Sequence, residues 1–176
     1  MVHIREPGPH DAAALGRVHV AAWQTGYRGI FPDEQLAAMS VEEREQAWTR
    51  ILDHPSRPGM VRLVATLQDD GPVVGFAVAG PARHDETVGE LHALNVDPDV
   101  WGRGVGGALL EAATDHLIGQ GFETAVLWVA TGNVRARRFY ERAGWRDDEV
   151  EREEEVLGVT AHERRYRRDL PADAPS

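Results

Sequence analysis

The spacing of hydrophobic residues changes repeatedly along this chain of 176 residues, and each change marks a new secondary-structure element. Apolar residues three or four positions apart predict helices at residues 11–26, 40–54, 104–118 and 133–143. Alternating or continuous apolar runs predict strands at residues 2–6, 61–68, 73–80, 88–96 and 124–129, within 145–157, and at 162–169. The order of these elements predicts a mixed α/β domain.

Turn and capping residues set the boundaries of these elements. The segment 69–72, Asp-Asp-Gly-Pro, predicts a hairpin turn, so the three strands between 61 and 96 should form an antiparallel meander. Asp11 and Ser40 are suitable helix N-caps, and Gly144 is a natural helix stop. With no repeat and no linker, we expect one domain over residues 1–170 and a loose segment at 171–176.

The composition excludes several kinds of chemistry. All 19 basic residues are arginines, so lysine Schiff bases, lysine-bound pyridoxal phosphate and Walker-type phosphate loops are ruled out. The absence of cysteine rules out disulfides, thiolate nucleophiles and cysteine zinc sites. The net charge of −10 disfavours nucleic acid as a partner. No run of about 18 apolar residues predicts a membrane helix, and the first residues do not resemble a signal peptide, so we expect a cytoplasmic protein.

The most informative segment is the glycine-rich turn at 102–107, between a predicted strand and a predicted helix. Unpaired N–H groups at a helix N-terminus attract anions, and glycines allow a diphosphate to approach them. A purely structural tight turn is the alternative. Gly102, Gly104 and Gly107 also match the dinucleotide fingerprint, but residues 97–99 separate the strand from the glycines, and the acidic candidate Glu123 precedes its strand instead of ending it.

Together with later residues, this turn resembles the GNAT superfamily of acyl-CoA-dependent N-acyltransferases. The family signature Gln/Arg-x-x-Gly-x-Gly/Ala appears at 101–106 as Trp-Gly-Arg-Gly-Val-Gly, with Trp101 departing from the usual first residue. The second block, Asn-x-x-Ala-x-x-Phe-Tyr, occupies 133–140 and precedes Gly144 and Trp145. Residues 23–32 are similar to the acceptor-side segment of many bacterial members.

The resemblance implies a mixed, mostly antiparallel sheet, splayed beside the strand before the glycine turn and flanked by helices. It also implies acetyl-CoA as co-substrate, with no metal. The expected cofactor-binding residues are Leu94, Asn95, Val96, Arg103, Gly104, Val105, Gly106, Gly107, Asn133, Arg135 and Tyr140. Many members of the family pair, so the resemblance also suggests a homodimer.

Acetyl transfer to an amine requires a base for the amine and an acid for the departing thiolate. Strand alternation predicts that Glu90, His92 and Leu94 share one face. The resemblance makes Glu90 the general base, through water, although an exposed strand pair is the alternative. Helical geometry separates Phe139 and Tyr140 by about 100°, and the resemblance makes Tyr140 the general acid while Phe139 packs.

The acceptor would bind near residues 23–28 and the predicted strand at 88–96. Trp23, Gln24, Tyr27 and Arg28 fall within one and a half helical turns, and His92 is a further candidate. Ordinary packing is the alternative for the first four, and a structural role is the alternative for His92. The acidic run at 147–155 either steers a cationic amine or forms a solvated face.

We therefore predict an N-acetyltransferase that moves an acetyl group from acetyl-CoA to a primary amine of a small molecule or peptide by direct attack. The acidic charge favours a cationic acceptor. A non-catalytic acyl-CoA-binding sensor or partner module remains an alternative, because it would keep the glycine turn without needing Glu90 or Tyr140. A nicotinamide-dependent dehydrogenase is a third reading of the glycines.

Overall fold

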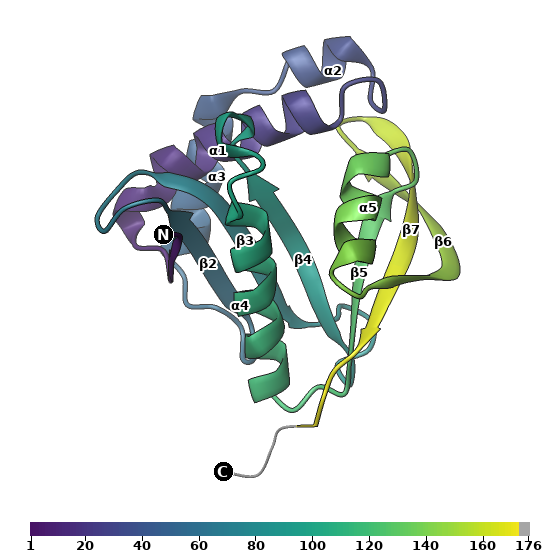
Figure 1. Ribbon diagram of the computed structural model, residues 1–176. Helices are drawn as coiled ribbons and strands as arrows, with labels where there is room; N and C mark the ends of the chain where they lie inside the picture. Colours follow the sequence, from purple (N-terminus) through teal and green to yellow (C-terminus); the bar gives the residue numbers. More distant parts are fainter. Residues whose placement is uncertain (173–176) are drawn as a thin grey trace.

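The computed structural model describes residues 1–172 and contains one seven-stranded sheet (Figure 1). The strands lie in the order β1-β2-β3-β4-β5-β7-β6. Their bounds are β1 (His3–Arg5), β2 (Val61–Thr66), β3 (Val73–Pro81), β4 (Gly89–Val96), β5 (Thr124–Ala130), β6 (Arg146–Val156) and β7 (Val159–Asp169). Every neighbouring pair is antiparallel except β4 and β5. The mixed, mostly antiparallel sheet is therefore confirmed.

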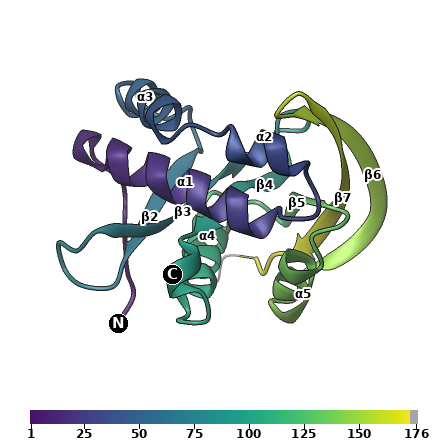
Figure 2. The same ribbon diagram turned by 90° about the horizontal axis from the view of Figure 1, so that it is seen from above.

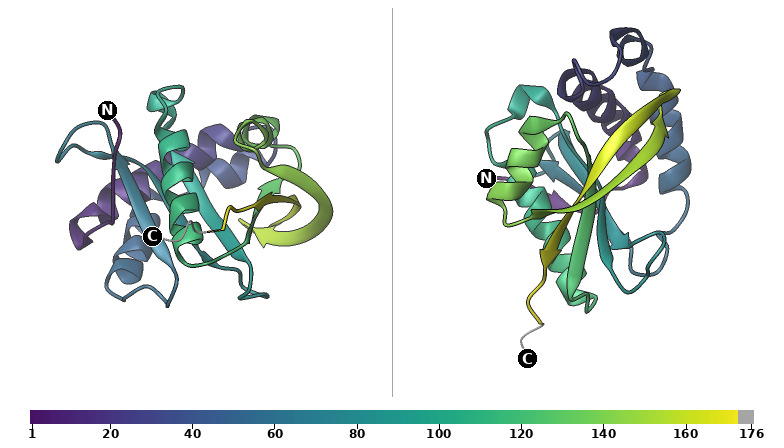
Figure 3. Two further views of the ribbon diagram at one scale, coloured as in Figure 1. Left: turned by 60° about the horizontal axis from the view of Figure 1, so that its bottom comes forward. Right: turned by 90° about the vertical axis from the view of Figure 1, so that its right-hand side faces the viewer.

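Helices cover both faces of this sheet (Figures 2 and 3). Two of them, α1 (Ala12–Gly26) and α3 (Val41–Leu52), lie on one face together with the short α2 (Asp33–Ala37). The other face carries α4 (Val105–Gly119) and α5 (Val134–Arg142). The four predicted helices are confirmed. The pattern missed α2 because five residues with a single buried leucine, Leu36, show no helical period.

Each face of the sheet has its own hydrophobic core. On the α4 side, Leu109 and Leu117 pack against the sheet residues Ala77 and Leu127. On the other side, Leu15, Val18 and Trp48 surround Phe76. The second core requires α1 and α3 to approach closely at Gly16, where an added Cβ would lie 2.7 Å from the backbone nitrogen of Glu45.

The predicted caps gave two different outcomes. Ser40 caps α3 as predicted, because its hydroxyl accepts a hydrogen bond from the Glu43 N–H at 3.2 Å. Asp11 stands at the N-cap position of α1, but its side chain makes no cap bond. Its carboxylate instead accepts two hydrogen bonds from Arg5, at 2.7 and 2.9 Å, and one from the Gly8 N–H. The carboxylate binds the Arg5 guanidinium instead of the N–H groups at the start of α1. These bonds hold the pKa of Asp11 below its usual value.

Two irregularities shape the middle of the sheet. β4 and β5 pair only where Gly89–Leu91 meets Ala125–Leu127, and beyond these residues the strands diverge (Figure 1). This confirms the expected splay. A bulge also shifts the register with β3, since Ala79 faces Leu91 while Val78 faces Ala93.

The bulge corrects the predicted faces of β4. The alternation rule placed Leu91 and Leu94 on opposite faces, but both pack into the core on the α4 side, whereas Ala93 packs on the α1 side. An inserted residue at His92 reverses the alternation for every residue after it. Glu90 and Leu94 therefore do not share a face.

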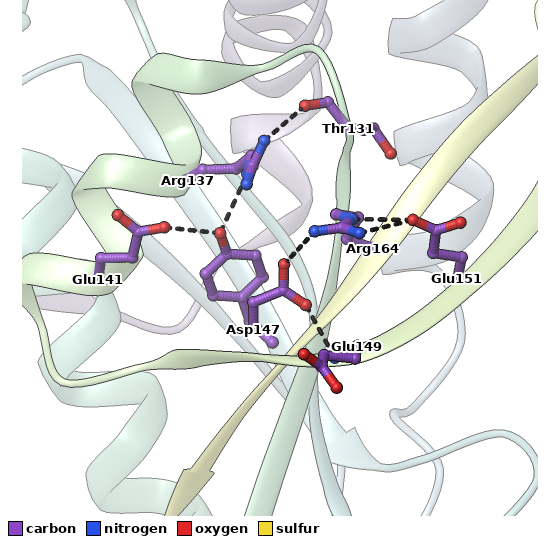
Figure 4. Close-up of polar contacts among 8 residues, drawn as sticks. Thr131, Arg137, Glu141, Asp147, Glu149, Glu151 and Arg164 are labelled. Atoms are coloured by element: carbon purple, nitrogen blue, oxygen red, sulfur yellow. Dashed lines mark hydrogen bonds and ion pairs between the residues drawn. The ribbon is translucent and has the colours of Figure 1, made fainter.

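Two hydrogen-bonded clusters hold the edge of the sheet together, one joining α5 to β7 and the other joining β7 to β6 (Figure 4). The Tyr166 hydroxyl on β7 donates to Glu141 at 2.8 Å and accepts from Arg137 at 3.0 Å. Arg137 also donates to the Thr131 carbonyl. Farther along β7, Arg164 bridges Asp147 and Glu151 of β6. The contacts of Arg137 and Glu141 hold α5 beside β7 and Thr131, which follows the end of β5.

Of the predicted loose segment 171–176, residues 173–176 lie outside the described part of the chain. Among the helices of residues 1–172, none has the length and apolar character that crossing a membrane requires.

Candidate active site

A cavity of about 450 Å³ opens where β4 and β5 part. Its walls come from α1, β4, the glycine turn, β5, α5 and the β6–β7 hairpin. Thirteen residues selected from the sequence line this cavity: Trp23, Tyr27, His92, Leu94, Asn95, Val96, Gly104, Val105, Gly106, Gly107, Asn133, Arg135 and Tyr140. Segments far apart in the sequence thus meet around one space.

Four selected residues do not belong to this lining: Gln24, Arg28, Glu90 and Arg103. The Gln24 amide donates to the Leu36 carbonyl at 2.9 Å, so it holds α2 against α1. Arg28 and Arg103 have exposed side chains. Glu90 is only 8% exposed and lies beside His92 at the closed end of β4.

The glycine turn presents free N–H groups to the cavity. Gly102 and Gly104 have φ values of +77° and +81°, a conformation that residues with a Cβ rarely adopt. The Ala108 N–H donates to the Gly104 carbonyl at 3.0 Å across the first turn of α4. The N–H groups of Val105, Gly106 and Gly107 precede that bond, so they have no acceptor within the helix. This arrangement suits a phosphate group.

Tyr140 lies on the opposite wall, on α5. The residue is 9% exposed, and its ring packs edge-on against Phe139 and Trp145, with ring centroids 5.1 and 6.4 Å away. Within residues 1–172, no protein group hydrogen bonds to its hydroxyl. Burial raises the pKa of Tyr140 well above its usual value, and nearby Tyr27 adds to this rise while Arg135 opposes it. The hydroxyl therefore stays protonated at neutral pH and can act as a proton donor.

Asn133 begins the helix that carries Tyr140. Its side-chain oxygen accepts a hydrogen bond from the Ala136 N–H at 3.1 Å, which makes it the N-cap of α5. This cap fixes the start of the helix, and with it the direction in which Tyr140 points.

His92 in the cavity wall and Glu90 behind it form a close pair. The His92 Nε2 lies 3.1 Å from the Pro81 carbonyl, a contact that requires Nε2 to carry a proton. The Nδ1 then faces the Glu90 carboxylate at 3.5 Å. Of the two, only His92 lines the cavity, and both of its ring nitrogens face protein groups.

The other end of the cavity is aromatic. Trp23, Tyr27 and Phe31 pack against one another with centroid distances between 4.6 and 6.0 Å. Phe31 also packs with Ala161 at the β6–β7 hairpin. Burial, and then the Glu163 carboxylate, raise the pKa of Tyr27 to about 12. Tyr27 is therefore neutral at physiological pH.

Comparisons with known proteins identify the family. The model of the Acetyltransferase (GNAT) family matches residues 20–145 of the chain. An uncharacterized N-acetyltransferase of Archaeoglobus fulgidus is 36% identical over 143 residues, which are 79% of this chain and 89% of that protein. The chain belongs to the GNAT family of acetyltransferases.

Other relatives share a smaller part of their length with this GNAT chain. The mycothiol acetyltransferase of Stackebrandtia nassauensis is 40% identical over 86 residues, which are 47% of this chain but only 28% of that protein. The fold is that of PaiA N-acetyltransferase from Thermoplasma acidophilum in complex with coenzyme A, at a TM-score of 0.71 and 20% identity, covering 97% of this chain and 99% of that one.

Trp101 shows how this GNAT chain departs from the family signature. Its indole N–H donates to the Val96 carbonyl at 2.9 Å, and the Arg135 guanidinium lies 3.6 Å from the centre of its ring. Sequence reasoning marked Trp101 only as an exception. The structure places it in the cavity wall beside Gly102 and Gly104.

Among the lining residues that sequence reasoning missed are Trp128, Arg142 and Glu163. Trp128 on β5 stacks with Arg152 at 4.2 Å, and Arg152 donates to Glu163 at 2.6 Å. None of these residues belongs to the two signature blocks, so no motif could have identified them. They reach the cavity from three different elements, β5, α5 and β7, which only the folded chain brings together.

The acidic run at 147–155 forms most of the edge strand β6. Asp147 and Glu151 pair with Arg164, and Asp148 pairs with Arg165. These ion pairs neutralise part of the acidic run and join β6 to β7. Within residues 1–172, no three His, Asp or Glu side chains gather into a group that could hold a metal ion.

Proposed function

We propose that this protein is an acetyl-CoA-dependent N-acetyltransferase that acetylates a primary amine by direct attack. One observation carries the proposal: the free N–H groups at the start of α4 and the protonated Tyr140 hydroxyl line the same cavity. That combination suits a thioester whose diphosphate is bound at one wall and whose sulfur lies near a proton donor at the other.

The cofactor would follow the splay of the sheet. Val105, Gly106 and Gly107 would donate N–H groups to the diphosphate, and exposed Arg103 would add positive charge at the rim. Leu94 and Asn95 would flank the pantetheine arm where β4 no longer pairs with β5. Arg135 and Asn133 would contact the cofactor from α5.

Glu90 would accept the proton of the attacking amine. Because Glu90 lies behind His92 and both ring nitrogens of His92 face protein groups, we propose that Glu90 acts as the general base through water rather than by direct contact. The amine nitrogen then forms a bond to the thioester carbon. The C–S bond breaks as the oxyanion collapses, and Tyr140 donates its proton to the departing sulfur. The products are the N-acetyl amine and CoA.

The acceptor would bind at the aromatic end of the cavity, against the packed rings of Trp23, Tyr27 and Phe31. Apolar walls favour an amine on an apolar or aromatic small molecule or peptide segment. Glu163 is the carboxylate nearest this end, with a side chain 17% exposed and already paired with Arg152. A cationic acceptor would therefore meet the Glu163 carboxylate, whose charge Arg152 already neutralises in part.

Calorimetry on the purified protein tests the cofactor first. We expect micromolar binding of acetyl-CoA and CoA and no binding of NAD or NADP. Acetyl-CoA binding would then justify a screen of amines by release of free thiol. Binding without thiol release by any amine class would favour the sensor or partner module, and failure to bind CoA would overturn the acyltransfer proposal.

A further inference from the structure

We propose that Trp101 is a positioning residue that holds the cation of Arg135 beside the glycine turn, ready for the diphosphate of CoA. The inference rests on the proposed function for the identity of the ligand. It concerns a position where the family signature has glutamine or arginine and this chain has tryptophan. It assigns a purpose to the replacement of glutamine or arginine by tryptophan at this position.

Arg135 is a partly buried cation without an anionic partner. Within residues 1–172, no carboxylate lies within 4.0 Å of its guanidinium, and no hydrogen bond holds that group. Burial lowers the pKa of Arg135, although nearby Tyr140 and Tyr27 oppose this shift. Its main contact is the face of Trp101, 3.6 Å away. A desolvated arginine stacked on an aromatic ring retains its donors for an incoming anion.

Trp101 is itself fixed before any ligand binds. Its indole N–H donates to the Val96 carbonyl at 2.9 Å, and its backbone N–H donates to the Pro98 carbonyl at 3.2 Å. The ring therefore cannot rotate freely between the end of β4 and the glycine turn. Its one polar hydrogen is also in use, so Trp101 cannot donate to a phosphate as a glutamine or arginine could.

The stack on Trp101 joins the positive charge of Arg135, on α5, to the segment that leads into α4. Trp101 stands three residues before Gly104, the N-cap of α4, and both residues line the cavity with Arg135. The contact between Trp101 and Arg135 therefore holds a guanidinium in the cavity whose lining also contains Val105, Gly106 and Gly107. In a chain without lysine, this arrangement supplies a cation for the diphosphate inside the cavity, whereas Arg103 lies exposed outside its lining.

A double-mutant cycle tests the coupling. The dissociation constants of CoA and of S-acetylpantetheine, which lacks the diphosphate, are measured for the wild type, Trp101→Leu, Arg135→Gln and the double variant. We expect each single change to weaken CoA binding about tenfold, with the double variant no weaker than Arg135→Gln. Trp101→Phe keeps an aromatic face and should recover most of the affinity. The loss for S-acetylpantetheine should be much smaller.

Trp128→Leu is the matched control, because Trp128 also lines the cavity and also stacks with an arginine, Arg152. It should change the affinities for both ligands by a similar factor. Thermal unfolding checks that each variant folds. If Trp101→Leu does not fold, the affinities of Trp101→Phe are measured in its place.

Two results would overturn the inference alone. One is additive losses in the double variant, which would mean that Trp101 does not act through Arg135. The other is an equal loss for both ligands in Trp101→Leu, which would mean that the ring packs against the pantetheine arm. A wild-type protein that does not bind CoA would instead refute the proposed function and this inference with it.

Discussion

Replacing Tyr140 with phenylalanine should lower kcat about 100-fold and leave the dissociation constant of acetyl-CoA nearly unchanged. The phenylalanine ring keeps the edge-on contacts with Phe139 and Trp145. The lost hydroxyl has no hydrogen-bond partner within residues 1–172, so the free energy of unfolding should change by less than about 1 kcal/mol. A 100-fold loss corresponds to about 2.7 kcal/mol of transition-state stabilisation. This is the contribution expected of a proton donor to the thiolate.

The pH dependence sharpens this prediction. Burial raises the pKa of Tyr140 well above its usual value of 10, so the hydroxyl stays protonated through pH 9. Its ionisation therefore produces no fall in the wild-type rate below pH 10. Tyr140→Phe should lower the whole profile of kcat against pH without moving its limbs.

Tyr166→Phe is a matched control with the opposite expected result. Its hydroxyl bonds to Arg137 and Glu141 and is not part of the cavity lining. Losing these bonds should cost about 1–2 kcal/mol of stability, while kcat stays within about twofold. The assays are thiol release for kcat, calorimetry for binding and urea unfolding for stability. An equal loss of kcat and affinity in Tyr140→Phe would reassign that residue to packing or binding, and an unchanged kcat would refute its role as an acid.

Three further predictions concern the base and the core. Glu90→Gln should lower the rate of thiol release at neutral pH and recover part of it at high pH, where free amine is abundant, whereas a sensor's CoA affinity would not respond. Burial among aromatic rings, and then Arg44, lower the pKa of His19 from 6.5 to about 4. Because the unfolded chain binds this proton more readily, the free energy of unfolding should fall by roughly 2 kcal/mol between pH 7 and pH 5. His19→Phe should flatten that slope in urea titrations at the two pH values. Gly16→Ala should cost about 1–3 kcal/mol by separating α1 from α3, and a neutral melting temperature would contradict the close approach.

Much of the fold follows from local features of the chain. Apolar spacing, the cap at Ser40 and the stop at Gly144 each act within a few residues, so the corresponding helices and strands appeared at the predicted places. The glycines at 102–107 determine a tight turn before a helix wherever that helix packs. The two signature blocks are also local, so the amino-acid sequence alone indicated the family and the class of ligand.

The tertiary structure decided how those pieces meet. The bulge at His92 depends on pairing with β3, and it brought Leu91 and Leu94 to one face of β4. The stack of Arg135 on Trp101 joins residues 34 positions apart, and no local period encodes that contact. Hydrophobic periodicity records which face of an element is buried, but not which distant element covers it. For that reason the sequence determined the chemistry available to this protein, and only the packed fold decided which side chains share its cavity.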